Sequence, residues 1–433
     1  MRYYSTNRQS PPVSFREAAI RGQAPDKGLY FPESIPVLES GMMANLGSIS
    51  NEDIAFRVIR PFAGDCIDEE TLFRIVSETV NFPIPLVPVT EQIASLELFH
   101  GPTLAFKDTG ARFMSRCLGY FTREEKEKIT VLVATSGDTG GAVANGFYNV
   151  EGVEVVILYP SGKVSPVQEK QLTTLGNNIR ALEVGGSFDD CQAMVKQAFA
   201  DEELCNHIFL TSANSINVAR WLPQQFYYFF ALKQWGDPAH PPVIAVPSGN
   251  FGNICAGILA MQSGLPVKHF IAACNQNDIV SGYLQTGDLV PKKAVPTLSN
   301  AMDVGNPSNF LRILELFQNQ FPLLKAKLSA ATITDRETED TINKVFADSG
   351  YILDPHGAVA YLALERYQQL VPDSKGLFLE TAHPVKFPEA VERITKQQIP
   401  IPDSLQPMMQ KEKQSIFIPP GYQHLKDYLW HKD

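Results

Sequence analysis

Apolar residues recur with two different periods along the chain. Up to about residue 82 they recur at helical spacing, most clearly over residues 15–20, 49–62 and 71–80. From residue 129 onward, short and nearly continuous apolar runs alternate with helix-spaced segments. Such runs are typical of strands that are buried on both faces of a parallel sheet. We therefore predict a mostly helical N-terminal region followed by an α/β body.

The α/β body contains a series of predicted strands, most of them followed by a helix. The strands are expected at residues 129–135, 153–159, 179–184, 243–246, 269–274 and 377–380. Helices are expected at residues 142–148, 191–199 and 254–261, and Ser187 to Asp190 resembles a capping box. Strands that alternate with helices form mainly parallel sheets with right-handed crossovers. Ligands are then expected at the carboxyl ends of the strands.

Proline-rich stretches indicate where the body begins and ends. Three prolines within residues 82–88 exclude a regular helix, so this stretch is a linker or an edge strand. We place a domain boundary there. The predicted domains are a helical N-terminal domain (1–82), a large domain (83–110 with 226–400), a smaller α/β domain (111–225) and an irregular C-terminal tail (401–433).

Composition excludes several classes of partner. The chain of 433 residues is 44% hydrophobic and carries a net charge of −10, so nucleic acid is not an expected partner. The composition does not exclude a small anionic substrate, because a local pocket can be positive on an acidic protein. The six cysteines form no CxxC pair, which favours reduced thiols. The eight histidines show no HExxH spacing, so no structural metal is expected. No signal peptide and no membrane span are predicted, and we expect a cytoplasmic protein.

Lys107 is the first candidate for chemistry. It stands in an apolar stretch that runs from Phe99 to Asp108. If this stretch is buried, the ammonium form is disfavoured, and the neutral amine becomes a nucleophile that forms Schiff bases with carbonyls such as pyridoxal phosphate. Taken alone, the stretch favours a surface lysine on a short turn, and further stretches of the chain reverse this preference.

Two glycine-containing turns follow predicted strands. Residues 248–253 (Ser-Gly-Asn-Phe-Gly-Asn) have the small residues and the helix start that suit a phosphate. Residues 136–141 are a similar turn that suits a carboxylate or a second phosphate. An ordinary tight turn is the alternative for both. A nicotinamide site is not favoured, because the next strand ends at Leu158-Tyr159-Pro160 without an acidic residue.

Two further stretches carry weaker signals. Asn214, Ser215 and Arg220 are spaced so that they would meet on one anion if a helix begins between them. The alternative is a capped helix with a solvated arginine. Thr381 follows a predicted strand, where its hydroxyl would face a ring nitrogen or would simply end the strand.

Taken together and in this order, these stretches resemble the threonine synthase family, which are pyridoxal phosphate enzymes of fold type II, the tryptophan-synthase-β-like fold. The resemblance extends from near the N-terminus to about residue 395. The stretches that carry it are 98–108 (LFHGPTLAFKD), 134–140 (ATSGDTG), 214–217 (NSIN), 247–252 (PSGNFG), 298–304 (LSNAMDV) and 381–384 (TAHP).

The resemblance implies an enzyme of amino-acid biosynthesis that converts O-phospho-L-homoserine and water into L-threonine and phosphate. Lys107 matches the residue that holds pyridoxal 5'-phosphate, and Thr381 matches the partner of its ring nitrogen. The cofactor phosphate matches Ser248, Gly249, Asn250, Phe251, Gly252 and Asn253. The substrate is expected at Thr135, Ser136, Thr139, Asn214, Ser215 and Arg220.

Asp138 departs from the pattern of many fold relatives, which carry asparagine at this position. A carboxylate beside the cofactor's ring oxygen would be repelled, so a proton must lie between them or Asp138 must turn away. The nearest alternative function is a related phospholyase that releases a keto acid, phosphate and ammonia. A non-catalytic relative that binds a phosphorylated metabolite is a further alternative, against which Lys107 argues. The acidic composition favours a monomer, with a dimer as the alternative.

Overall fold

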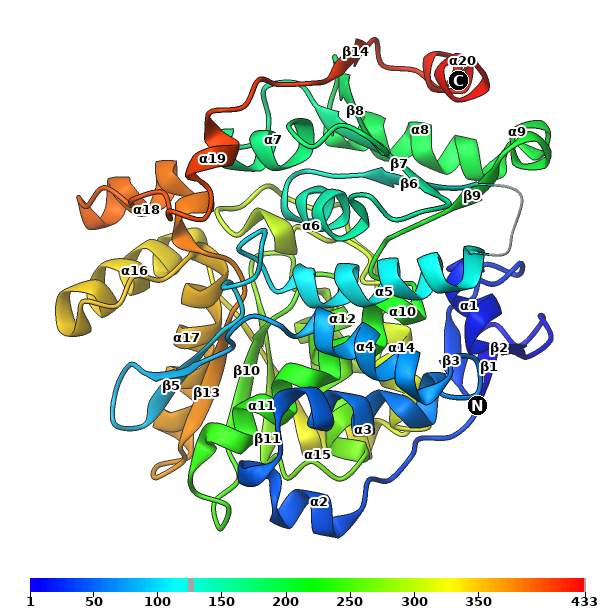
Figure 1. Cartoon of the computed structure of the whole chain (residues 1–433). Helices are drawn as coiled ribbons and strands as arrows, with labels where there is room; N and C mark the ends of the chain where they lie inside the picture. The colour runs from blue at the N-terminus through cyan, green and yellow to red at the C-terminus, as the bar shows by residue number, and fades with distance from the viewer. Residues whose placement is uncertain (124–127, 432–433) are drawn as a thin grey trace.

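Two separate parallel sheets form the centre of the molecule, and an N-terminal region packs beside them (Figure 1). The structure is a computed structural model that describes residues 1–123 and 128–431. The predicted mixture of mainly parallel sheets and flanking helices is confirmed.

The larger sheet has six strands in the order β12-β11-β10-β13-β5-β4. All neighbours are parallel except β4, which lies antiparallel to β5 at the edge, as predicted for the proline-rich stretch. Its central strand β10 is buried along its whole length. The strands are β4 (Leu86–Pro88), β5 (Ile93–Glu97), β10 (Val243–Pro247), β11 (His269–Cys274), β12 (Leu328–Thr332) and β13 (Gly376–Glu380).

Helices flank this sheet, and several of them pack directly against its strands. They are α10 (Val218–Trp221), α11 (Phe226–Trp235), α12 (Gly252–Gln262), α13 (Ile279–Thr286), α14 (Phe310–Leu316), α15 (Phe321–Lys327), α16 (Asp335–Ser349), α17 (Pro355–Leu370) and α18 (Pro388–Thr395). Short 3₁₀ turns are η2 (Leu222–Gln225), η3 (Asn300–Met302) and η4 (Pro384–Lys386).

The smaller sheet has five parallel strands in the order β14-β8-β7-β6-β9. Helix α5 lies against α6 and α10, between this sheet and the larger one (Figure 1). The strands are β6 (Ile129–Ala134), β7 (Val153–Pro160), β8 (Ile179–Val184), β9 (Phe209–Thr211) and β14 (Ile416–Ile418). The helices are α5 (Lys107–Thr122), α6 (Asp138–Phe147), α7 (Pro166–Thr173), α8 (Phe188–Ala200) and α9 (Glu202–His207).

The prediction of an irregular C-terminal tail is wrong. Strand β14 pairs in parallel with β8, and helix α20 (Tyr422–Trp430) packs against α8. Leu425 and Leu429 are buried there with Met194. A three-residue strand beside two prolines has no readable period, so the pairing comes from the apolar edge of β8 rather than from the tail's own pattern. Helix α19 (Gln406–Met409) precedes β14.

The N-terminal region contains the predicted helices and also a small sheet that was not predicted. Helices α1 (Phe15–Arg21), α2 (Ser40–Ala44), α3 (Asn51–Ala63) and α4 (Glu69–Thr79) are accompanied by the turn η1 (Leu46–Ser48). Strands β1 (Arg2–Ser5), β2 (Val13–Ser14) and β3 (Tyr30–Pro32) form an antiparallel sheet in the order β2-β1-β3. Two to four residues are too few for a period of two to show.

Helix boundaries follow local capping groups. The predicted box at the start of α8 is confirmed, because Asp190 accepts from the Ser187 amide at 2.7 Å and Ser187 Oγ accepts from the Asp190 amide at 3.2 Å. Helix α6 begins at Asp138, four residues earlier than predicted, so Asp138 and Thr139 form its first turn. All six cysteines are free thiols. Within the described ranges, no helix combines the length and the apolar character that a membrane crossing needs.

Candidate functional site

The loop before α5 places Lys107 beside Thr381. The Asp108 carboxylate accepts from the Thr103 amide at 2.8 Å and from its hydroxyl at 2.5 Å, which closes the turn around Leu104. The Phe106 amide donates to the Thr381 carbonyl at 2.9 Å, and a β-bridge joins Ala105 to Ala382. The motifs around Lys107 and Thr381 therefore form one structure at the carboxyl end of β13.

The Lys107 amine forms no hydrogen bond or ion pair with any residue that the structure describes. Burial lowers its pKa to about 8. The negative charge of Asp138 acts against this shift, and the positive charges of Lys386 and Arg220 add to it. An amine with this pKa is partly neutral near pH 7 and acts as a nucleophile.

The turn between β10 and α12 presents unpaired backbone donors. Phe251 adopts the left-handed conformation (φ +61°), and α12 begins at the next residue. In the described part of the chain, no acceptor lies within hydrogen-bonding range of the N–H groups of residues 249–253. A Cβ at Gly249 would lie 2.5 Å from the Met302 backbone, so only glycine fits. Successive free N–H groups at a helix start form an anion site.

The side chains of this turn face inward. Ser248 donates to the Val246 carbonyl at 2.8 Å, and the Asn253 amide oxygen accepts from Tyr227 and Tyr228 at 2.7 Å each. The Asn253 amide nitrogen is buried and has no partner in the described part of the chain. These side chains fix the turn, and its backbone is left for a ligand.

Asn250 connects this turn with the 214–217 stretch. Its amide nitrogen donates to Ser215 Oγ at 2.7 Å, and its amide oxygen accepts from the Ser308 N–H at 2.7 Å. Asn309 adds a longer contact to Ser215 at 3.4 Å. Ser215 therefore accepts from two amides, and its own O–H is left to donate to a ligand.

Arg220 is a buried cation with unused donors. One guanidinium nitrogen donates to the Ala213 carbonyl at 2.6 Å, whereas Nε has no partner among the residues that the structure describes. Burial lowers its pKa to about 10, so it stays charged at neutral pH. The Asn214 side chain also makes no hydrogen bond to a described residue. Unsatisfied donors around a buried charge fit an anionic ligand.

The predicted substrate residues in the turn after β6 fall into two groups. One is used by the turn's own backbone, and the other is free to bind a ligand. Thr135 is not available to substrate, because its hydroxyl donates to the Gly137 carbonyl and accepts from the Gly137 and Gly140 amides at 2.9–3.1 Å. Thr135 therefore shapes the turn. The half-buried Ser136 and Thr139 hydroxyls have no partner within the described ranges and are free to bind a ligand.

Asp138 is turned toward a buried lysine. Its Oδ1 lies 2.7 Å from Lys386 Nζ and accepts from Gln168 Nε2 at 2.9 Å. Although burial opposes it, the charge of Lys386 helps to lower the pKa of Asp138 to about 2. Asp138 is therefore an ionised carboxylate and does not donate a proton.

Sequence reasoning missed Lys386 and Gln168, and it quoted Asp108 only as part of a motif. Lys386 follows the predicted Thr381–Pro384 stretch by two residues, between prolines, where a lysine is typical of an exposed turn. The signal that could have identified Lys386 was its position shortly after the end of a predicted strand, where Thr381 was already a candidate residue.

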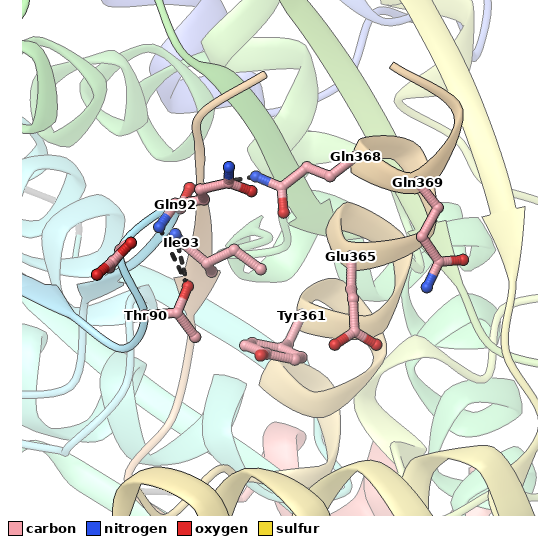
Figure 2. A pocket seen from close by; sticks show the side chains of 8 residues that line it. Thr90, Gln92, Ile93, Tyr361, Glu365, Gln368 and Gln369 are labelled. Atoms are coloured by element: carbon pink, nitrogen blue, oxygen red, sulfur yellow. Dashed lines mark hydrogen bonds between the residues drawn. The ribbon is translucent and has the colours of Figure 1, made fainter. Parts of the chain in front are cut away.

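A pocket lies at the end of the larger sheet opposite to Lys107 and Thr381 (Figure 2). Its lining includes Gln92 and Ile93 at the start of β5, together with Tyr361 and Glu365 of α17. Ile93 pairs with Gly376, the first residue of β13, whereas Thr381 follows the last. The lining carries no lysine or arginine, so this pocket does not suit a phosphate.

The residues at the strand ends fit a pyridoxal phosphate group. The free N–H groups of residues 249–253 suit its phosphate, the Lys107 amine suits its aldehyde, and the Thr381 hydroxyl is without a partner in the described protein. The separate donors at Asn214, Ser215 and Arg220 are left for another anion.

Comparison with known proteins agrees with this geometry. The family model described as "Pyridoxal-phosphate dependent enzyme" matches residues 85–380. The models described as "Threonine synthase N terminus" and "Threonine synthase, C-terminal" match residues 2–80 and 357–429.

Individual relatives match over the full length. A threonine synthase of Serratia marcescens is 45% identical over 433 residues, with 99% of each chain covered. The crystal structure of threonine synthase from Escherichia coli has a TM-score of 0.91 at 42% identity, with all of both chains covered. A threonine synthase structure from Brucella melitensis, described as bound to PLP, has a TM-score of 0.93 at 35% identity, with 100% and 99% covered. The chain belongs to the threonine synthase family of pyridoxal-phosphate-dependent enzymes.

Proposed function

We propose that the site around Lys107 converts O-phospho-L-homoserine and water into L-threonine and phosphate. The observation that carries this proposal is a free amine of lowered pKa that shares one site with two separate anion-binding groups. One group, the turn at residues 249–253, suits the cofactor phosphate. The other, which contains Arg220, suits the phosphate of the substrate.

In this proposal the cofactor is held by Lys107, the 249–253 backbone and Thr381. When bound, pyridoxal phosphate supplies an electron sink for charge that develops on the substrate carbons. Lys107 takes and returns protons at those carbons, since its pKa of about 8 lies near the working pH.

The remaining side chains orient the substrate. Arg220, Asn214 and Ser215 donate to its phosphate and hold that group as it leaves. The Ser136 and Thr139 hydroxyls, at the start of α6, receive its carboxylate. Retention of the phosphate would allow it to assist the addition of water.

Product analysis tests the proposed reaction. Purified protein with O-phospho-L-homoserine is expected to release L-threonine and inorganic phosphate in equal amounts. Keto acid and ammonia in place of threonine would instead identify a phospholyase. Lys107→Ala is expected to abolish turnover, and substantial activity of that variant without an added amine would remove Lys107 from the mechanism.

A monomeric state and a cytoplasmic location are also proposed, on the basis of the acidic composition and the absence of CxxC pairs. Sedimentation equilibrium at micromolar concentration is expected to give a mass near 47.9 kDa. Twice that mass would replace the monomer by a dimer.

A further inference from the structure

Lys386 joins two loops that belong to different sheets. It lies at the end of η4, after β13 of the larger sheet, and its side chain is fully buried. Its Nζ lies 2.7 Å from Asp138 Oδ1, at the start of α6 under the smaller sheet. The same Nζ donates to the Thr103 carbonyl at 2.7 Å, in the loop that precedes Lys107.

Neighbouring amides and acids hold both partners of Lys386 in place. Gln168 donates to the same Asp138 oxygen at 2.9 Å, and Gln171 donates to the same Thr103 carbonyl at 3.0 Å. Thr103 is tied in turn to Asp108, the residue after Lys107. A continuous chain of contacts therefore runs from the first turn of α6 to the first turn of α5.

Lys107 has no such partner among the described residues, although the charge of Asp138 acts on it. Asp138 acts on Lys107 through its charge, yet no ion pair joins the two residues. A buried carboxylate without a counterion is costly, so a released Asp138 would pair with the nearest amine. Lys386 pairs with the Asp138 carboxylate and thereby prevents it from pairing with Lys107.

We propose that Lys386 is a positioning residue that holds the ionised Asp138 on the Thr103 loop and thereby keeps Lys107 unpaired and reactive. The proposal rests on the proposed role of Lys107 as the amine that holds the cofactor. It also answers the question that Asp138 raises, since the carboxylate is neutralised by Lys386 and needs no proton.

Among the described residues, three charged groups act electrostatically on the Lys107 amine, and each has a predictable effect. Asp138 of α6 raises its pKa, whereas Lys386 of η4 and Arg220 of α10 lower it, in addition to the larger effect of burial. Removal of Lys386 takes away one repulsive charge and frees the carboxylate to pair with Lys107. Both changes stabilise the ammonium form, so the pKa of Lys107 must rise.

The test measures the pKa of Lys107 in cofactor-free protein. The rate at which added pyridoxal phosphate is trapped on Lys107 by borohydride is followed from pH 6 to pH 10, with the label located by peptide mapping. The midpoint in the unmodified protein is expected near 8. In Lys386→Met we expect a midpoint about one pH unit higher or more, and in Lys386→Arg a midpoint close to the original.

A double variant distinguishes a midpoint shift caused by the released charge from one caused by damage to the fold. In Lys386→Met combined with Asp138→Asn, both charges are gone, and the midpoint is expected to return close to the original value. A midpoint that stays high in the double variant would contradict the proposal, because the shift would then not come from the released carboxylate. Lys344→Met removes a lysine that pairs with Glu365 between α16 and α17 and is the matched control, with no shift expected.

The outcomes distinguish this inference from the proposed function. If Lys107 is labelled in Lys386→Met at an unchanged midpoint, the inference is wrong and the role of Lys107 stands. If unmodified protein is not labelled on Lys107, the role of Lys107 fails first. Lys386→Gln keeps a donor for the Thr103 carbonyl and serves if the methionine variant does not fold, and a midpoint unchanged in it would equally overturn the inference.

Discussion

At the scale of single residues, Arg220 is the side chain whose buried charge and unpaired donor best suit an anion. Its Nε is buried without a partner within residues 1–123 and 128–431, and Gly110 leaves the room it needs, since a Cβ there would lie 3.1 Å from that nitrogen. Its burial without an ion-paired acid leaves its charge for a ligand.

Arg220→Ala is expected to lower kcat/KM for the phosphorylated substrate by about 10²-fold, the loss of a charge-assisted hydrogen bond of roughly 1.5–3 kcal/mol. Steady-state kinetics measures this effect. The amount of pyridoxal phosphate trapped on Lys107 is the control and should not fall. Unchanged kinetics would remove Arg220 from the substrate site.

Glu380 is a second buried ionisable residue, and its protonation state affects the stability of the fold. It ends β13 beside Asp354, and burial together with the charge of Asp354 raises its pKa well above the usual 4.5. The folded state therefore keeps a proton that the unfolded state loses. Stability must fall as the pH rises above about 4.5, because the unfolded chain binds fewer protons there.

Glu380→Gln is expected to remove this dependence, since the amide resembles the protonated acid. Thermal midpoints of the variant and the parent, recorded from pH 5 to pH 9, should differ increasingly in favour of the variant as the pH rises. Parallel curves would show that Glu380 is not protonated in the fold.

At the scale of elements, sequence pattern and structure agree where an element is long and buried on both sides. The strands that contain residues 129–134, 153–160, 243–247 and 269–274 were predicted within one or two residues, because their apolar runs leave no other interpretation. Strand β14 and the N-terminal strands β1 to β3 were not predicted, since their pairing depends on distant partners.

Helix α20 shows how much such a distant contact contributes. Leu425 is fully buried against the smaller sheet. Leu425→Ala is expected to lower the free energy of unfolding by about 2–5 kcal/mol. Leu370→Ala changes a leucine that is 83% exposed and should have almost no effect. Urea unfolding measures both, and equal stability of the two variants would show that the tail does not pack as described.

The site itself was predictable only in part for the same reason. Lys107, Thr381 and the 248–253 turn were predicted from the stretches taken together, since each stretch alone also permits an ordinary turn or strand end. The ion pair between Lys386 and Asp138 joins residues 248 positions apart, 386 less 138, and no local pattern encodes it. Thr135 was predicted as the last residue of a strand and as a substrate residue, whereas β6 ends at Ala134 and the Thr135 hydroxyl is used by the backbone of the following turn.

At the scale of the whole molecule, the N-terminal region supports the 214–217 stretch, where we propose that the substrate phosphate binds. Arg312 is fully buried and donates to the Tyr30 carbonyl of β3 at 2.9 Å and to the Ile216 carbonyl at 2.6 Å. Asn217 reaches the Ala19 carbonyl at 2.8 Å. The 214–217 stretch is therefore held between the N-terminal region and α14, which carries Arg312 (Figure 1).

Arg312→Met is expected to destabilise the fold by about 1–3 kcal/mol for each carbonyl left without a donor and to raise KM for the phosphorylated substrate. Calorimetry and kinetics on the same preparation measure both effects. Loss of stability without a change in KM would show that the N-terminal region does not support substrate binding.

The most direct test of the account is to reduce the purified protein with borohydride in the presence of pyridoxal phosphate and to map the labelled peptide. Before reduction we expect a yellow protein, and after reduction a colourless one with about one pyridoxyl group for each chain and the label on Lys107. A protein that is colourless before reduction and binds no pyridoxal phosphate, or a label on another lysine, would contradict the account.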